Sequence, residues 1–493
     1  MLIFDPVSFD RRRLFRSRRR FRTLSERSMK PTSPPQTIAI VGAGFSGTLV
    51  AAHLLSRAKA PLTVHLIERE RSRFARGVAY STTEDCHLLN VPAGNMSAFP
   101  DDREHFLRWA QAREAEMLDC ACVGEVTAAA YLPRRAYGDY IAQILDEAER
   151  GAAPGVGLDR RIDEVASLKV EDGAVALRLA SGAQLRADRV VLALGNFRPG
   201  DPSGADGAFH RSARYHGDPW APEVLDRLLP TESCLLVGSG LTMVDWAVTL
   251  NQAGYRGAIH VVSRRGLWPQ SHKPGAPAAF GLEPSGKFGS VRNGLHSIRA
   301  FIRDTGTDWR PVIDALRPVT QTLWKGLGLS EQRRFLRHLR TFWDCHRHRL
   351  APGIAARLGA MLDSGQLVRH VGRIHAFRDL GRRVEVTLRP RGSDRRYVLN
   401  VDAVVNCSGS ESDYRRLDSP LVKDLLVQRL IRPDPLALGL DVADNGALID
   451  AEGRPSAVLF TLGPPQKGRL WETTAVPEIR GQAAGLAVEL LGG

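Results

Sequence analysis

Short apolar runs that end in glycine-rich turns recur along the chain. Residues 38–41 and 234–237 are two such runs, and each leads through closely spaced glycines into a segment with scattered apolar positions and then into a β-branched run. This order predicts a strand, a helix and a second strand in succession. Residues 36–80 therefore predict one strand–helix–strand unit, and the residues after 233 predict another.

Further predicted strands end in small residues and glycine. Residues 159–195 form a β-rich stretch that closes in RVVLALGN, and similar closing runs stand at 403–414 and 457–465. The order predicts an α/β fold with two Rossmann-like dinucleotide-binding domains. The second domain, residues 200–410, is expected to be inserted into the first, residues 31–199 and 411–493. A polar, mainly helical stretch at about 285–365 predicts a helical insertion in the second domain.

The glycines of the two turns follow the dinucleotide-binding fingerprint. Gly42, Gly44 and Gly47 form GAGFSG, and residues 238–243 form GSGLTM, in which methionine replaces the last glycine. The first glycine allows the tight turn, the second lets the backbone approach a pyrophosphate, and the third lets helix and strand pack closely. The N–H groups at the start of each helix are then expected to face phosphate oxygens.

The residues that end the following strands distinguish the two predicted sites. Glu68 follows the first turn, and a carboxylate there accepts hydrogen bonds from a ribose 2′-OH and repels a 2′-phosphate. Ser263, Arg264 and Arg265 stand at the matching place in the second unit, where guanidinium groups suit a phosphate. The sequence therefore predicts FAD at the first site and NADPH at the second.

Two other segments are candidates to surround a flavin ring. Residues 77–97 combine turn formers with apolar residues, which fits a loop that wraps the ring or an ordinary buried loop. Residues 471–480, WETTAVPEIR, place proline near a predicted helix start. The N–H groups of that helix start would face the flavin pyrimidine edge, or the segment is a plain capped terminal helix. The predicted FAD-binding residues are Gly42, Gly44, Phe45, Ser46, Gly47, Glu68, Asn90, Met96 and Gly195, and the predicted NADPH-binding residues are Gly238, Ser239, Gly240, Ser263, Arg264 and Arg265.

A basic cluster, His-Arg-His-Arg at residues 346–349, stands at the end of a predicted helix. Three roles are open for it. It contacts the phosphate of NADPH, it contacts the substrate, or it complements the carboxyl end of its own helix.

The net charge of +14 is unevenly distributed. Residues 1–30 hold nine arginines and one lysine against three acidic residues, so this predicted disordered tail carries half of the excess. The mildly basic remainder fits anionic cofactors, and we expect no nucleic-acid partner. No stretch reaches the roughly 18 apolar residues of a membrane span. The six cysteines lack disulfide or zinc spacing, and no apolar export signal is recognised, so we expect a cytoplasmic protein without a metal site.

Several segments together resemble the bacterial FAD/NAD(P)-binding proteins of the flavoprotein urate hydroxylase type, within the two-dinucleotide-binding-domain flavin monooxygenases. They are VGAGFSG, GVAYST, HLLNVPAGNMSAFPDD, YLPRRAYGDYI, VGSGLTMVD, VVSRRG, DCHRHRLAP and WETTAVPEIRGQA, and they extend from about residue 36 to the end. The resemblance implies reduction of FAD by NAD(P)H, reaction with O2 and hydroxylation of a small molecule. It also implies a urate-like purine as the substrate.

Three functions follow as hypotheses. The favoured one is an FAD-dependent, NADPH-using monooxygenase that needs a small-molecule substrate and O2. The others are an NAD(P)H:flavin reductase or oxidase that passes electrons to a partner, and a non-enzymatic nucleotide-binding protein. Because the cofactors supply the difficult chemistry, a catalytic triad or metal cluster is not required, and the sequence singles out no catalytic residue.

Overall fold

The computed structural model describes residues 35–118, 124–202, 204, 207–273, 280 and 289–492. Contacts divide the chain into residues 1–34 and a unit that begins at Pro35. The predicted basic tail, residues 1–30, lies outside the described residues.

The first sheet of the unit has six strands and is built from the two ends of the chain. Its neighbours are parallel except for the antiparallel pair β15–β16. In spatial order the strands are β15 (Ala447–Ile449), β16 (Pro455–Thr461), β7 (Arg189–Leu192), β1 (Gln36–Val41), β2 (Leu62–Glu68) and β3 (Val156–Ile162). Parallel strands need crossover connections, which explains the helices between them.

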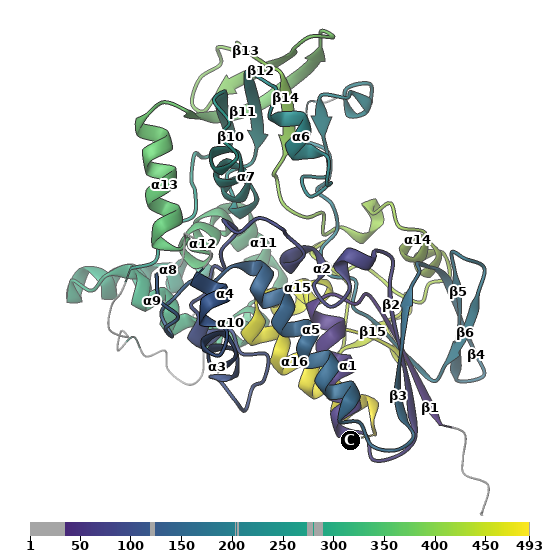
Figure 1. Ribbon diagram of the computed structural model, residues 1–493. Coiled ribbons are helices and arrows are strands. Elements are labelled where there is room, and N and C mark those ends of the chain that lie inside the picture. Colours follow the sequence, from purple (N-terminus) through teal and green to yellow (C-terminus); the bar gives the residue numbers. More distant parts are fainter. Residues whose placement is uncertain are drawn as a thin grey trace, which may run out of the picture. The chain divides into compact units, whose positions relative to one another are not determined.

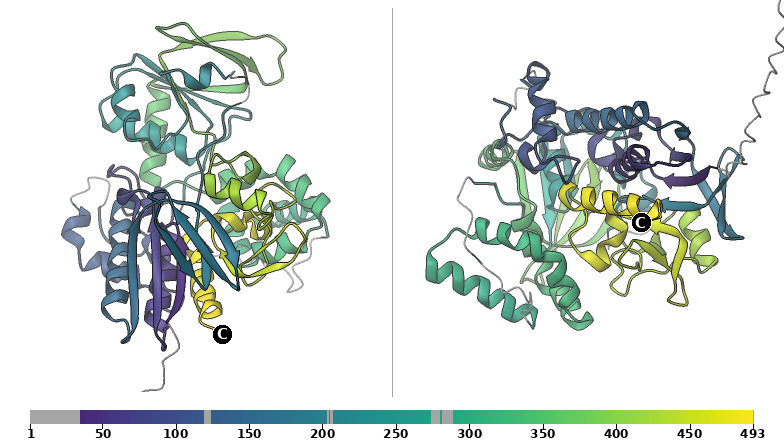
Figure 2. Two further views of the ribbon diagram at one scale, coloured as in Figure 1. Left: turned by 90° about the vertical axis from the view of Figure 1, so that its right-hand side faces the viewer. Right: turned by 90° about the horizontal axis from the view of Figure 1, so that it is seen from below.

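Three helices cover one face of this sheet. The central helix α1 (Phe45–Arg57) packs between α5 (Arg134–Arg150) and α16 (Val476–Leu490), as Figures 1 and 2 show. Residues 45–55 of α1 are all buried, because neighbours enclose the helix. Beyond the opposite face lie a small antiparallel sheet and the helix α14, which packs on it. These elements are β4 (Val165–Glu171), β5 (Ala174–Leu179), β6 (Gln184–Ala187) and α14 (Pro420–Val427).

The second sheet has seven strands and is built from residues between 215 and 406. Its parallel part is extended by two antiparallel strands at one edge. In spatial order the strands are β13 (Tyr397–Val401), β12 (Val384–Pro390), β11 (Leu367–Asp379), β10 (Ala258–Ser263), β9 (Ser233–Val237), β14 (Ala403–Asn406) and β8 (Tyr215–His216). The helices α7 (Leu241–Gln252) and α13 (Pro352–Asp363) contribute to its hydrophobic core.

Helices fill the connection between β10 and β11, within the stretch predicted to be a helical insertion. They are α8 (Val291–Thr305), α9 (Trp309–Leu316), α10 (Thr320–Gly326), α11 (Leu329–His338) and α12 (Arg340–Arg347), followed by α13. Trp324 on α10 stacks on Trp471 near the C-terminus, with ring centroids 5.1 Å apart. The insertion therefore packs against the last segment of the first sheet's own domain.

Shorter helices lie in the connections. The α-helices are α2 (Gly77–Tyr80), α3 (His105–Gln111), α4 (Glu114–Leu118), α6 (Val224–Leu228) and α15 (Lys467–Leu470). The 3-10 helices are η1 (Arg71–Arg73), η2 (Ala93–Asn95), η3 (Phe209–Arg211), η4 (Arg317–Val319), η5 (Tyr414–Arg416) and η6 (Pro464–Gln466).

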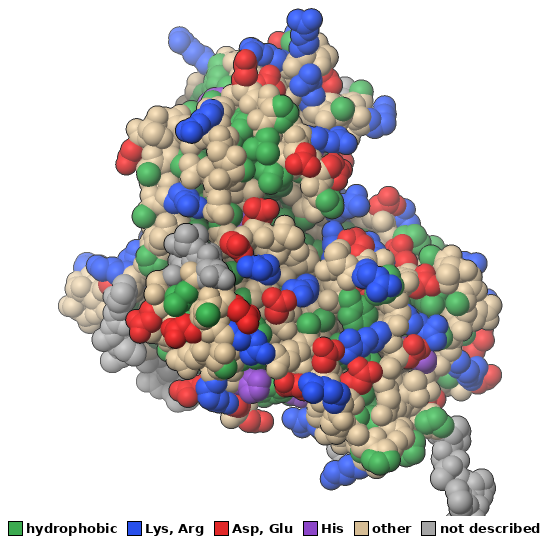
Figure 3. Space-filling model, viewed as in Figure 1, with side chains coloured by type: hydrophobic (Ala, Val, Ile, Leu, Met, Phe, Trp, Pro, Cys, Tyr) green, Lys and Arg blue, Asp and Glu red, His purple; other side chains and the backbone are tan. Residues whose placement is uncertain are grey.

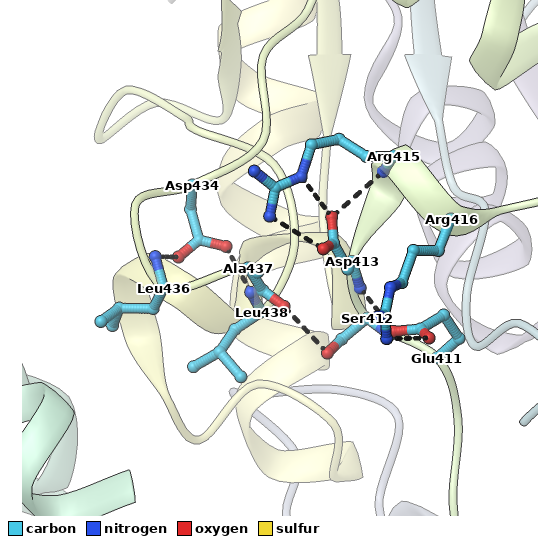
Figure 4. Close-up of polar contacts among 9 residues, drawn as sticks. All are labelled: Glu411, Ser412, Asp413, Arg415, Arg416, Asp434, Leu436, Ala437 and Leu438. Carbon is cyan, nitrogen blue, oxygen red and sulfur yellow. Dashed lines mark hydrogen bonds and ion pairs between the residues drawn. The ribbon is translucent and has the colours of Figure 1, made fainter. Parts of the chain in front are cut away.

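The two connections between the sheets lie side by side. The Glu411 backbone N–H donates to the Arg198 carbonyl (3.1 Å), and the Asn406 side-chain amide donates to the Gly200 carbonyl (3.0 Å). The returning segment is further fixed by Ser412, whose N–H donates to the Glu411 carboxylate and whose hydroxyl donates to a neighbouring loop (Figure 4). These bonds join the start and the end of the inserted segment.

Acidic and basic side chains are interspersed over the face shown in Figure 3, and neither sign covers it alone. Of the helices that the structure describes, none combines the length and the apolar character needed to cross a membrane.

Candidate active site

The first glycine turn joins β1 to α1 and has room only for glycine. Gly42 has φ +100°, and an added Cβ would lie 2.4 Å from the Ala193 carbonyl oxygen. A Cβ on Gly47 would lie 2.0 Å from the Gly42 carbonyl oxygen. Gly44 is the N-cap of α1, no side chain caps this end, and the first turn holds no acidic residue. The free N–H groups of this turn therefore fit a phosphate anion.

Glu68 and two further glycines surround this turn. The Ala43 N–H donates to Glu68 Oε2 (3.1 Å), which holds the carboxylate beside the glycines. An added Cβ on Gly77 would lie 3.0 Å from the Cα of Gly44, and one on Gly463 would lie 2.9 Å from the Ser46 hydroxyl. The narrow glycine walls and the adjacent carboxylate fit the pyrophosphate and ribose of a dinucleotide.

The other predicted FAD residues differ in their placement. The buried Phe45 ring packs against Tyr80, with centroids 5.9 Å apart, and Met96 is buried in the same hydrophobic core. Gly195 has φ +63° and faces open space, and Asn90 lines a large cavity. Because their side chains are used in the core, we expect Phe45 and Met96 to approach FAD through their backbones.

The second glycine turn joins β9 to α7 in the same way. Gly238 has φ +109°, and an added Cβ would lie 2.4 Å from the Cys407 carbonyl oxygen. Gly240 is the N-cap of α7, again without a side-chain cap. Ser239 turns its hydroxyl to the Leu267 carbonyl (2.6 Å). Met243, in place of the third glycine, is fully buried, so this unit leaves space for its side chain.

The two arginines predicted to bind the 2′-phosphate have different surroundings. Arg264 is exposed, and among the described residues it has no hydrogen-bond or ion-pair partner. Arg265 donates to the carbonyls of His338 (3.2 Å) and Arg337 (3.3 Å), at the carboxyl end of α11. Cations there stabilise the helix dipole. Arg264 is thus available for a ligand, whereas Arg265 already stabilises the insertion.

A turn beside these arginines brings in a residue that sequence analysis did not find. The Ser263 hydroxyl accepts from the Gly266 N–H (3.1 Å), so its oxygen stabilises the turn after β10. Arg369 on the next strand, β11, lies with Nη1 3.5 Å from the Gly266 carbonyl and its guanidinium 5.6 Å from the Trp268 ring centroid. Only strand pairing brings Arg369 to this turn, which is why its local sequence gives no signal.

A cavity of about 1100 Å³ lies where the two segments predicted to surround the flavin ring meet the helical insertion. The first glycine turn is close by, because Leu462 in the cavity wall precedes Gly463, which approaches Ser46. The lining residues used below are Asn90, Pro92, His272, Asp314, Arg317, Arg347, Arg349, Leu462, Glu472, Pro477 and Glu478. Residues 77–97 and 471–480 were predicted to surround a flavin ring, and residues from both segments line this cavity.

Charged side chains from the insertion and the C-terminus meet in this cavity. Arg317 donates through Nε and Nη2 to the two carboxylate oxygens of Glu478 (2.9 and 3.2 Å). Arg349, which is buried, contacts the Asp314 carboxylate. Arg317 and Asp314 were not predicted, and Arg347 and Arg349 belong to the basic cluster at residues 346–349. The two arginines of that cluster therefore line this cavity, and Arg347 also lies in the last turn of its own helix.

Glu472 is held in the cavity wall by a strained turn. Trp471 has φ 60° and ψ −67°, and the Glu472 N–H donates to the Leu470 carbonyl (2.7 Å), which defines a γ-turn of the rare left-handed form. Such a conformation costs about 1–3 kcal/mol and persists only where packing enforces it. The stacking of Trp471 on Trp324 supplies packing of this kind.

The Glu472 carboxyl is 4% exposed and is charged in this setting. Burial raises the pKa of a carboxyl group, but the electrostatic influence of His348 and Arg347 and the hydrogen bond from Trp343 outweigh it, so the pKa of Glu472 lies below its usual value. The Trp343 indole N–H donates to Glu472 Oε1 (2.7 Å). The cavity therefore contains a fixed anion beside the arginines.

His272 joins the second domain to the flavin loop. Its Nε2 lies 3.0 Å from the Asn90 carbonyl oxygen, so Nε2 carries the proton in this contact. Burial, reinforced by the charge of Arg349, lowers the pKa of His272 to about 4. The ring is therefore neutral at pH 7.

Buried polar contacts also connect α7 with the first domain. Arg134 donates through Nη1 and Nη2 to the two carboxylate oxygens of Asp245 (2.7 and 3.0 Å). His87 Nε2 lies 2.8 Å from the Thr249 hydroxyl. Because all four side chains are largely buried, these contacts resist separation of the two domains.

Comparisons with known proteins agree with this architecture. Residues 39–197 match a family model described as FAD-NAD(P)-binding. No curated protein matches the chain in sequence. Similar solved structures include the ornithine N-hydroxylase of Kutzneria sp. 744 with reduced FAD, NADP+ and L-ornithine (14% identity, 93% of this chain and 99% of that chain covered, TM-score 0.61). A second is an ornithine hydroxylase from Pseudomonas aeruginosa (15% identity, 93% of this chain and 98% of that chain covered, TM-score 0.62). A third is L-lysine 6-monooxygenase from Pseudomonas syringae (16% identity, 93% of this chain and 99% of that chain covered, TM-score 0.61).

The predicted α/β fold with two dinucleotide-binding domains is confirmed by these structures. The prediction of FAD and NADP as cofactors agrees with the family description and with the contents of the Kutzneria structure. By name all three proteins are hydroxylases or monooxygenases, and the Kutzneria structure contains reduced FAD. The finer resemblance to the urate hydroxylase type finds no support among them.

Proposed function

We propose that the chain is an FAD-dependent, NADPH-using monooxygenase that hydroxylates a small molecule in the 1100 Å³ cavity. The observation that carries the proposal is the one cavity shared by the loop at Asn90 and the start of α16 at Pro477. Leu462 lines the same cavity and directly precedes Gly463, the glycine that approaches α1. The similar structures of ornithine and lysine hydroxylases support the same reaction type.

Residues of this chain would hold the cofactors as follows. The free N–H groups at the start of α1 bind the FAD pyrophosphate, and Glu68 accepts hydrogen bonds from the adenosine ribose. The start of α7 binds the second pyrophosphate, and Arg264 binds the 2′-phosphate of NADPH. The start of α16 would lie beside the flavin ring, where the helix dipole stabilises negative charge. Pro477 has no N–H and the Glu478 and Ile479 N–H groups donate to the Ala475 carbonyl, so the dipole and not a set of free N–H groups makes this contribution.

FAD supplies electron transfer from NADPH and the activation of O2. The helical insertion forms the far wall of the cavity. The charged pairs in this wall orient the substrate. A urate-like purine remains a candidate substrate on the sequence resemblance, and ornithine and lysine are candidates because the similar structures act on them.

The test is a purification followed by a substrate screen. We expect a yellow protein with one FAD, which oxidises NADPH faster when its substrate is present and forms hydroxylated product in proportion to the NADPH consumed. Purines, amino acids and diamines form the first panel. If every compound tested gave one hydrogen peroxide per NADPH consumed and no hydroxylated product, the oxidase hypothesis would be supported instead. A colourless protein that takes up no added FAD would refute both enzyme hypotheses.

A further inference from the structure

Arg347 in the cavity wall has an unused pair of hydrogen-bond donors that neighbouring groups enclose almost completely. Its side chain is 7% exposed, yet Nε and Nη2 have no hydrogen-bond partner among the described residues. Glu478 Oε1 lies 3.9 Å from Nη2, which is beyond hydrogen-bond distance. Nε and Nη2 form one edge of the guanidinium group, and this edge offers two parallel N–H donors.

The neighbouring arginine shows what such an edge binds in this cavity. Arg317 uses its own Nε and Nη2 to hold both oxygens of the Glu478 carboxylate, at 2.9 and 3.2 Å. Arg349 adds a third unused donor, because its buried Nε also lacks a partner in the described part of the chain while its Nη2 contacts Asp314. Two parallel acceptors of one small anion would satisfy these donors.

Within the described part of the chain, no acceptor lies within hydrogen-bond distance of Arg347 Nε or Nη2. Burying a charged group with unmade hydrogen bonds is destabilising, so the fold retains Arg347 at a cost. Glu472 balances the charge of Arg347 through space, but its Oε1 accepts from the Trp343 indole. A ligand that brings its own anion into the cavity recovers this cost as binding energy.

We propose that Arg347, together with Arg349, binds the carboxylate of a small organic acid, so that the substrate of this enzyme is anionic. The carboxylate lies against the insertion, and the rest of the molecule extends towards the flavin segments at Asn90 and Pro477, which line the same cavity. That the acid is the molecule oxidised rests on the proposed function. That the acid binds at Arg347 does not, because binding can be measured without turnover.

A phosphate of FAD or NADPH is the other anion that arginines bind, and the placement of the cavity argues against it. None of residues 42–47 or 238–243 lines the cavity, although the structure describes all of them. The exposed Arg264 stands instead after the strand that follows the second turn. The two kinds of anion therefore have separate arginines.

The experiment measures ligand binding to the holoprotein by isothermal titration calorimetry and thermal shift. The probes are matched pairs, benzoate and benzamide, and succinate and succinamide, at constant ionic strength set with chloride. We expect a carboxylate to bind at least about 10-fold more tightly than its amide. Arg347→Gln should weaken that binding by about 10-fold or more, and Arg349→Gln should weaken it less.

The matched control is Arg264→Gln, which should weaken NADPH binding and leave carboxylate binding unchanged. Arg347→Gln should do the reverse, with unchanged FAD content and NADPH affinity. If removal of Arg347 destabilises the fold, Arg347→Lys keeps the charge without the two-donor edge and should still weaken carboxylate binding.

Two results would overturn the inference. One is a panel in which amides bind as tightly as carboxylates, or in which both Arg347→Gln and Arg347→Lys bind carboxylates as tightly as the wild-type protein does. The other is a loss of FAD or NADPH affinity in Arg347→Gln. Failure of the proposed function is separate, because it shows as missing FAD uptake or missing NADPH oxidation.

Discussion

The substitution Gly47→Ala tests whether the first turn holds FAD. The new Cβ would lie 2.0 Å from the Gly42 carbonyl oxygen and 3.1 Å from Ile40 Cγ2, whereas ordinary contact begins at 3.4 Å. The helix must therefore move by about 1.4 Å away from a backbone oxygen. Since residues 45–55 of α1 are buried, its neighbours oppose that shift. Overpacking of this kind costs about 1–3 kcal/mol, and occasionally more.

The same shift displaces the N–H groups at the start of α1. Loss of one hydrogen bond to a charged group costs about 1.5–3 kcal/mol. At about 1.4 kcal/mol per factor of ten, Gly47→Ala should weaken FAD binding by roughly 10- to 100-fold. The assay is quenching of FAD fluorescence on titration with the apoprotein, together with the melting temperature.

Gly359→Ala on α13 is the matched control, because a Cβ there meets nothing within 4 Å. Removing a glycine from a helix interior stabilises it by up to about 1 kcal/mol, and FAD affinity should not change. Wild-type FAD affinity in Gly47→Ala would refute the assignment of this turn to FAD.

Three further predictions concern the second site, the domain contacts and pH. Arg264→Ala should raise the KM for NADPH by about 10-fold or more and spare NADH, whereas Arg265→Ala should mainly lower the melting temperature, and equal effects on both cofactors would contradict this division of roles. Arg134→Ala or Asp245→Ala should each destabilise the fold by about 3–5 kcal/mol in denaturant melts, and the double variant should lose less than the sum of the two, so strict additivity would count against their pairing. The pKa of His272 is about 4 in the fold against an ordinary value of 6.5, so its contribution to stability is complete above pH 6.5 and is lost as pH falls towards 4; melting temperatures should decline over this range, less steeply in His272→Gln, and an identical decline would exclude this residue as a cause.

The glycine turns could be predicted from sequence because their requirements are local. The positive φ angles and close carbonyl contacts of Gly42 and Gly238 involve only the strand end and the segment beneath it. The strand order, however, depends on pairings between distant segments. β16 adjoins β7, and no periodicity in either run specifies that neighbour.

The same distinction between local and long-range requirements applies to the site residues. Arg265 has the sequence of a phosphate ligand, but the carbonyls that it binds belong to a helix about 70 residues later. Arg317 and Glu478 are 161 residues apart and meet only because the insertion packs on the C-terminal segment. A sequence motif specifies which residues are suitable for a ligand, whereas the fold decides which of them are already in use.

The position of β16 and α16 has a consequence for biosynthesis. Gly463, which approaches Ser46 at the start of α1, leaves the ribosome 417 residues after it, a delay of roughly 20–80 s at about 5–20 residues per second. The strands of the second sheet, residues 215–406, emerge completely during this interval, so that sheet is free to form first. Cofactor loading at the first turn is therefore a late event, and the nascent chain must keep the unfinished edge of β7 from pairing with other strands until then.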